Sequence, residues 1–165
     1  MLSEVKDIFS NVNNWLNFAE MKNGVLIALE VAFLAALDSM DMFGQEVKLG
    51  IEIMAIICMF PPLFSFIPRL NSYAKKKTGW VKQPDSIIFY ADIAKYEWEE
   101  YISLLYKRVQ SVEKEWKEVP VIEQEYAKEI IVNARIALFK YKCFSVGLRM
   151  LLILLLFVVA AFLVS

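Results

Sequence analysis

Residues 150–164 read MLLILLLFVVAAFLV, a run with no charged residue and no turn signal. Two further apolar stretches precede it, at Val25–Leu37 and Ile53–Ile67. The chain is 58% hydrophobic and has a mean hydropathy of +0.46, a pattern that places such a run in lipid rather than in a soluble core. The sequence therefore predicts an all-α, multi-pass membrane protein with three transmembrane helices, at about 23–43, 49–67 and 146–164.

Two of the predicted spans contain an acidic residue. Glu30 lies within the first span, and Glu52 lies one turn inside the second. A charge at the centre of a membrane costs about 3 kcal/mol on insertion scales, so acids there often have a function. Both are candidates for lining a pore or a gate. For Glu52 the alternative is a position near the interface, and for Glu30 it is pairing between helices. Pro61 and Pro62 predict a kink or break near the inner leaflet.

Charges in the connections predict the topology. The first connection, Asp38–Val47, has acidic residues and no Lys or Arg, whereas the second is basic. By the positive-inside rule the N-terminus and residues 69–145 are cytoplasmic, and Ser165 lies outside. The basic residues are Arg69, Lys75, Lys76, Lys77 and Lys82, followed before the last span by Lys128, Arg135, Lys140, Lys142 and Arg149.

The cytoplasmic region is predicted to be a helical hairpin with a long stalk. From Val121 to Val164 the pattern is helical without interruption, and apolar residues recur at heptad spacing. A second amphipathic helix starts near Trp98 and ends before Pro120. A short amphipathic helix at 2–18 either lies on the membrane surface or packs on the protein. The stalk seam consists of Ala127, Ile130, Ala134, Ala137, Tyr141, Phe144, Leu148 and Leu151.

Composition limits the possible functions. The 165 residues suffice for one domain, 1–165, and a net charge of −1 gives no field for nucleic acid. The sequence contains no histidine, and its two cysteines have neither metal-ligand nor redox-pair spacing. No nucleophile–base pair, metal cluster or phosphate loop is recognisable, so we expect neither an enzyme nor a bound cofactor.

Three segments resemble a known family. They are FAEMKNG at 18–24, IIFYADIAK at 87–95 followed by EEY at 99–101, and the stalk from Tyr126 to Tyr141. Their order and spacing resemble the transmembrane effector of Pycsar, a bacterial antiphage system, over most of the chain from Phe18 onward. The resemblance implies a bacterial inner-membrane effector. It also implies that a partner pyrimidine cyclase makes cCMP or cUMP upon infection, and that the effector then impairs the membrane.

The residues suggest where such a ligand would bind. Tyr90, Asp92, Lys95 and Trp98 offer aromatic faces and polar groups for a base, although a helix cap with packed aromatics explains them equally well. Arg135 and Lys142 belong to a basic stripe at seven-residue spacing, with Lys128 and Arg149. This stripe suits a phosphate on a nucleotide or a lipid headgroup, or else it anchors the topology.

Two overall functions fit these patterns. Three spans cannot enclose a pore alone, so a pore-forming effector is expected to be a homo-oligomer in contact with membrane lipid. The alternative is a non-conducting membrane adaptor that anchors a soluble partner through residues 84–120.

Overall fold

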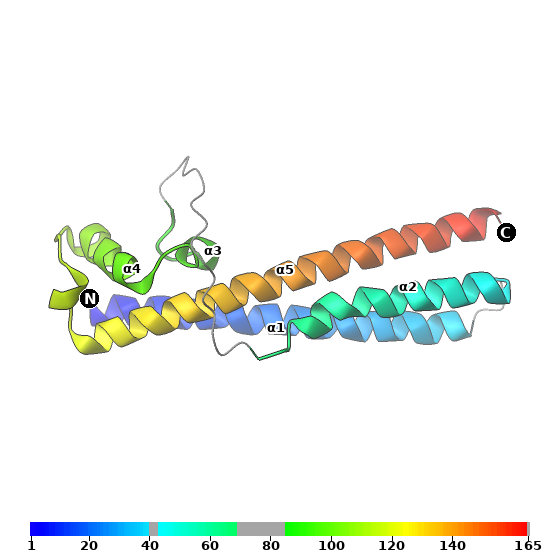
Figure 1. Ribbon diagram of the computed structural model, residues 1–165, viewed down its shortest axis with the longest axis horizontal. Coiled ribbons are helices and arrows are strands. Elements are labelled where there is room, and N and C mark those ends of the chain that lie inside the picture. The colour runs from blue at the N-terminus through cyan, green and yellow to red at the C-terminus, as the bar shows by residue number, and fades with distance from the viewer. Residues whose placement is uncertain (40–42, 69–84, 165) are drawn as a thin grey trace. The chain divides into compact units, whose positions relative to one another are not determined.

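The computed structural model describes residues 1–39, 43–68 and 85–164 (Figure 1). Every element in these ranges is helical, which confirms the all-α prediction. The basic segment from Arg69 to Lys82 and the turn residue Pro84 lie outside the described residues. The helices are α1 (Leu2–Asp38), α2 (Gln45–Phe64), α3 (Tyr90–Ile93), α4 (Trp98–Leu105) and α5 (Val121–Val164), with a π-helical turn at Tyr106–Gln110 and a 3₁₀ turn at Trp116–Glu118.

The chain divides into two compact units. One contains residues 1–18 and 69–139, and we call it the polar unit; the other contains residues 19–68 and 140–165, and we call it the apolar unit. Both α1 and α5 contribute residues to each unit. Helix α5 is a single helix of 44 residues, as the sequence predicts, with a length of about 65 Å at 1.5 Å per residue.

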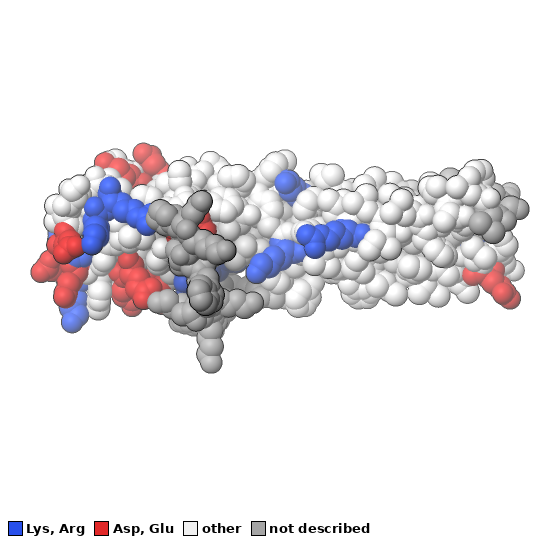
Figure 2. Space-filling view, turned by 90° about the horizontal axis from the view of Figure 1, so that it is seen from above, with Lys and Arg blue, Asp and Glu red and all other residues white. Residues whose placement is uncertain are grey.

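The apolar unit is built from three helical segments. Within it α1 and α5 run in the same direction and α2 runs against both (Figure 1). The buried cluster at its core consists of Leu37, Phe43, Ile51, Ala55, Cys58 and Leu154. Large apolar side chains also cover its outer surface, and Figure 2 shows an uncharged stretch between basic side chains and the acidic side chains at the far end. A surface of this kind is stable in lipid but not in water.

Two helices are long and apolar enough to cross a membrane. They are α2, at Gln45–Phe64, and the C-terminal part of α5 within Val121–Leu163. The segment expected as the first span, 23–43, is not one of them among the described residues, because Lys22, Glu30 and Asp38 interrupt its apolar pattern. Pro61 and Pro62 lie in the last turn of α2, where neither can donate a backbone hydrogen bond, and the helix ends two residues later at Phe64.

Two helix boundaries differ from the sequence prediction. Residues 2–18 are not a separate short helix, because α1 continues without a break to Asp38. Val5 and Val12 on its apolar face are fully buried, so this stretch packs on the protein. Helix α4 does not reach Pro120: after the π-helical turn, Ser111 adopts a left-handed conformation with φ 58° and ends the helix.

The predicted stalk seam is correct for its first half. Ala127, Ile130, Ala134 and Ala137 are fully buried. From there the buried positions move by one residue, to Lys140, Cys143 and Gly147, before the pattern returns to Leu151. This shift turns Lys140 into the interior of the apolar unit, where the heptad pattern places Tyr141.

Gly147 lies where helices of the apolar unit pack closely. A Cβ atom at this position would lie 2.8 Å from Cδ of Pro62 and 3.1 Å from Cδ2 of Leu26. The proline ring is stiff, so the helices would have to separate to make room. Small residues at such crossings allow membrane helices to pack closely.

Replacing Gly147 by Ala should therefore destabilise the apolar unit by about 1–3 kcal/mol, the usual cost of overpacking. Gly50→Ala is the matched control, because a Cβ there meets nothing within 4 Å and helix propensity favours Ala. Thermal unfolding in detergent, followed by circular dichroism, measures both. Equal midpoints for the two variants would contradict the close packing.

Candidate functional site

The signature loop before α3 is held by a polar network within the polar unit. The Lys95 ammonium donates to Asp85 Oδ1 at 2.8 Å and to Asp92 Oδ1 at 2.5 Å. Asp92 Oδ2 accepts the Ser86 N–H at 3.0 Å, and the Tyr96 hydroxyl donates to Asp85 at 3.1 Å. Asp92 and Lys95, two of the predicted ligand residues, therefore lie together in an ion pair, which Lys95 shares with Asp85.

This network shifts the pKa values of Asp92 and Lys95. Burial raises the pKa of Asp92, but the hydrogen bonds from Lys95 and from the Ser86 N–H outweigh it, and the net pKa is lowered. Hydrogen bonds to Asp85 and Asp92 raise the pKa of Lys95 despite its partial burial. Both residues are thus held in their charged forms at neutral pH.

The aromatic residues of the signature are packed against neighbours. Tyr90 is buried, with its ring 5.5 Å from that of Trp15 and 4.7 Å from that of Phe89. Trp98 lies against Trp116 edge to face at 5.2 Å, with the Lys128 ammonium 4.9 Å above its ring. These are the contacts of packed aromatic side chains. Among these aromatic residues Phe89 has the largest exposed fraction, 41%.

Arg135 is directed into the polar unit. Its side chain is 7% exposed, and its guanidinium donates to the carbonyls of Ala94 and Tyr96 and to Glu97 Oε1 at 3.3, 2.8 and 3.0 Å. A planar fork of donors suits this set of acceptors. The guanidinium thereby ties the connection between α3 and α4 to α5.

The basic stripe is therefore not uniform. Lys128 pairs with Glu125 at 2.6 Å, and Arg135 is buried. Lys142 and Arg149 are exposed and belong to the apolar unit. The six predicted ligand residues thus divide between the units: five lie in the polar unit, and Lys142 lies in the other.

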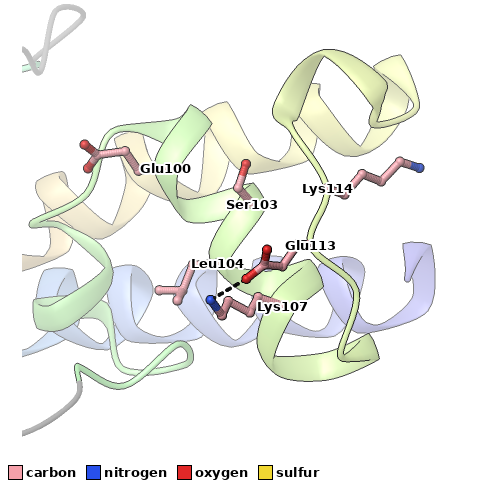
Figure 3. A pocket seen from close by; sticks show the side chains of 6 residues that line it. All are labelled: Glu100, Ser103, Leu104, Lys107, Glu113 and Lys114. Carbon is pink, nitrogen blue, oxygen red and sulfur yellow. Dashed lines mark hydrogen bonds and ion pairs between the residues drawn. The ribbon is translucent and has the colours of Figure 1, made fainter.

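An open pocket of about 340 Å³ lies beside α4 (Figure 3). It contains two carboxylates and two ammonium groups, and Lys107 pairs with Glu113 at 2.7 Å across it. The pocket lacks the net positive charge that favours a phosphate diester, and none of the predicted ligand residues lines it. Its lining consists of Glu100, Ser103, Leu104, Lys107, Glu113 and Lys114.

The apolar unit contains a buried acid that has no hydrogen-bond partner among the described residues. Glu30 has no exposed surface, and neither of its carboxyl oxygens accepts a hydrogen bond from any residue that the structure describes. Asn23 lies two helical turns earlier on the same buried face, and its Oδ1 likewise has no donor among the described residues. Glu52, the other predicted pore residue, is partly exposed on α2. The two acids are thus not equivalent.

A second polar group joins the three segments of the apolar unit. The Lys140 ammonium donates to the Ser65 carbonyl at 3.0 Å and pairs with Glu20 Oε1 at 2.9 Å. Asn23 Nδ2 donates to the carbonyls of Ala19 and Lys140 at 2.8 and 3.0 Å. We call Glu20, Asn23, Ser65 and Lys140 the clasp.

Sequence reasoning assigns Lys140 to topology and gives Asn23 no role. The seven-residue spacing of Asn23 and Glu30 is a readable signal, because it places both on one helical face. The inward direction of Lys140 carries no such signal, since it depends on the shift in the buried positions of α5.

Comparison with known families identifies the chain. The Pycsar effector protein domain matches residues 4–165. The chain belongs to this family. It is thus an effector of a bacterial antiphage defence, of a family that works with a cyclase and a cyclic nucleotide signal. No curated protein and no solved structure matches the chain. The two strongly apolar helices of this Pycsar effector are consistent with a place in the membrane.

Arg135→Gln should lower the free energy of unfolding by about 2–3 kcal/mol, because it leaves the Ala94 and Tyr96 carbonyls without their charged donor. Lys142→Gln, an exposed change on the same helix, should stay within about 0.5 kcal/mol. Denaturant unfolding in detergent compares them. If Arg135→Gln keeps full stability, the hydrogen bonds of the guanidinium do not stabilise the fold.

Asp92→Asn should lower the stability at pH 7 by about 1 kcal/mol, since Lys95 and Asp92 are both partly exposed. The contribution of Asp92 is present above its unfolded pKa and is lost as pH falls through its lower folded value. Lys95 stays charged throughout this acid range. The unfolding midpoints of variant and parent should therefore converge once the pH falls below the lowered folded pKa of Asp92, and a difference that persists in that acid range would contradict the ion pair.

Proposed function

We propose that this Pycsar effector makes the bacterial inner membrane permeable when a cyclic pyrimidine nucleotide, cCMP or cUMP, made by its partner cyclase, activates it. The observation that carries the proposal is Glu30, a fully buried acid without a described partner inside an apolar, lipid-compatible unit. A helix that serves as an anchor gains nothing from such a residue and incurs about 3 kcal/mol for it. A second state of the protein in which Glu30 contacts water or a cation would explain why an acid is buried here.

The chemistry of the buried groups favours cations. Among the described residues, the buried side-chain atoms of α1 without a hydrogen-bond partner are Asn23 Oδ1 and both oxygens of Glu30, and all three are acceptors. Acceptors are satisfied by protons or by metal cations, and rings of acidic side chains select cations in channels. Three helical segments cannot enclose a water-filled path, so the conducting form is a homo-oligomer surrounded by lipid.

The arrangement of the helices supports three crossings. In the apolar unit α2 runs against α1 and α5 (Figure 1). By their positions along these helices, Lys22, Lys140 and Lys142 belong to one end of the unit, and Glu46 and Glu52, which follow the connection between α1 and α2, belong to the other. By the positive-inside rule the basic end is cytoplasmic and the C-terminus is outside.

The signal is read in the polar unit. Asp92, Lys95 and the neighbouring aromatic residues supply polar and stacking groups, and α5 continues from this unit into the apolar unit as one helix. A nucleotide changes the equilibrium only if it binds the leaky state more tightly than the closed one.

Purified protein in liposomes loaded with dye and potassium tests the proposal. We expect cCMP or cUMP, but not cAMP or cGMP, to release potassium. Glu30→Gln should reduce that release at least roughly tenfold, since it removes the charge that lines the path. Glu52→Gln is the matched comparison and should have the smaller effect, because its side chain is partly exposed.

Two results would contradict this function. Release that is unchanged in Glu30→Gln would remove Glu30 from the path. No release with any of the four nucleotides, from correctly inserted protein, would favour the adaptor that anchors a soluble partner through residues 84–120.

A further inference from the structure

The clasp joins three helical segments at one level of the apolar unit. Lys140 of α5 bridges the Glu20 carboxylate of α1 and the carbonyl of Ser65, the residue that ends α2. The carboxyl end of a helix carries partial negative charge, so the ammonium lies between two negative groups. Asn23 adds a direct bond from α1 to the α5 backbone at 3.0 Å.

The end of α2 depends on this group. Pro62 meets α5 at Gly147, and the Ser65 hydroxyl donates back to the Pro62 carbonyl at 2.6 Å. Apolar side chains do not hold helices together in lipid, because lipid tails are equally apolar. Close packing at Gly147 and the polar bonds of Lys140 are therefore what keep this end of α2 against its neighbours.

The clasp can open because it is only half closed to solvent. The Lys140 side chain is 10% exposed, but that of Glu20 is 47% exposed, so water and ions reach the carboxylate. On the interior side of the clasp the Asn23 amide donates to the Lys140 carbonyl, and Glu30 follows seven residues later on the same buried face. Separation of α2 from Lys140 would give water a way to these two acceptors.

We propose that the clasp is the closure of the apolar unit: while Lys140 bridges Glu20 and Ser65, α2 stays in place, and release of Lys140 opens the unit toward Asn23 and Glu30. This inference rests on the proposed function for the effect of opening on the membrane, but the bond itself is tested separately. Lys140 is thus a positioning residue that sets the closed state.

The test replaces Lys140 by Met, which keeps the length of the side chain and removes its charge and donors. In lipid nanodiscs, the backbone amides of residues 65–67 should exchange with deuterium at least roughly tenfold faster than in the parent protein, since a bond to a charged group is lost. In dye-loaded liposomes the same variant should leak without any nucleotide.

Two further variants guard against a simple folding defect. Lys6→Met removes an exposed ammonium from α1 and should leave both exchange and leakage unchanged. Lys140→Arg keeps a charged donor and should restore slow exchange and a tight membrane. A Lys140→Met protein that is merely unfolded would show fast exchange throughout α1 and α5 rather than at the end of α2.

The outcomes separate the two proposals. Unchanged exchange at residues 65–67 in Lys140→Met overturns the clasp. Faster exchange without leakage, in a protein whose parent form does release potassium with cCMP or cUMP, also overturns it as the closure while leaving the proposed function intact. Faster local exchange with leakage that needs no nucleotide, reversed in Lys140→Arg, supports it.

Discussion

Helices gain no hydrophobic stabilisation from one another in a bilayer, and this constraint explains the apolar unit. The outward apolar side chains of α2 and α5 are as well solvated by lipid as by protein. What distinguishes the packed arrangement is therefore a contact that permits close approach, at Gly147, and a few polar bonds around Lys140. In such a unit the bonds of the Lys140 ammonium favour the packed arrangement more than the lipid-facing leucines do.

The polar unit follows the opposite rule. Here Val5, Val12, Ile93 and Ile102 are buried away from water, so burial itself stabilises the fold. Hydroxyl groups then fix the details: Tyr101 donates to the Ile87 carbonyl at 2.7 Å, and Tyr106 donates to Glu123 at 2.6 Å. Burial and the Glu123 hydrogen bond and charge raise the pKa of Tyr106 to about 12, so it remains a donor.

The parts of the fold that could be predicted are those that depend on a local period. The continuous α5, its buried alanines and the isolated Glu30 all follow from spacing along one helix. The end of α4 could not be predicted from the sequence. Trp116 packs on Trp98 although the chain turns at Ser111, so the apolar pattern continues past the end of the helix. The partners of Arg135 and Lys140 could not be predicted either. Both residues lie in basic stretches that are typical of a solvated surface, and the direction of their side chains depends on segments far away in sequence.

The long separation of the clasp residues along the chain affects biosynthesis. Asn23 and the carbonyl it binds are 117 residues apart. At about 5–20 residues translated per second, α1 emerges roughly 6–23 s before its partner on α5 exists. During this interval the amide of Asn23 and the acid of Glu30 have no α5 beside them. Another acceptor, such as water or a lipid headgroup, has to take the hydrogen bond of the Asn23 amide until α5 is made, so the synthesis of α5 completes the bonds of the clasp.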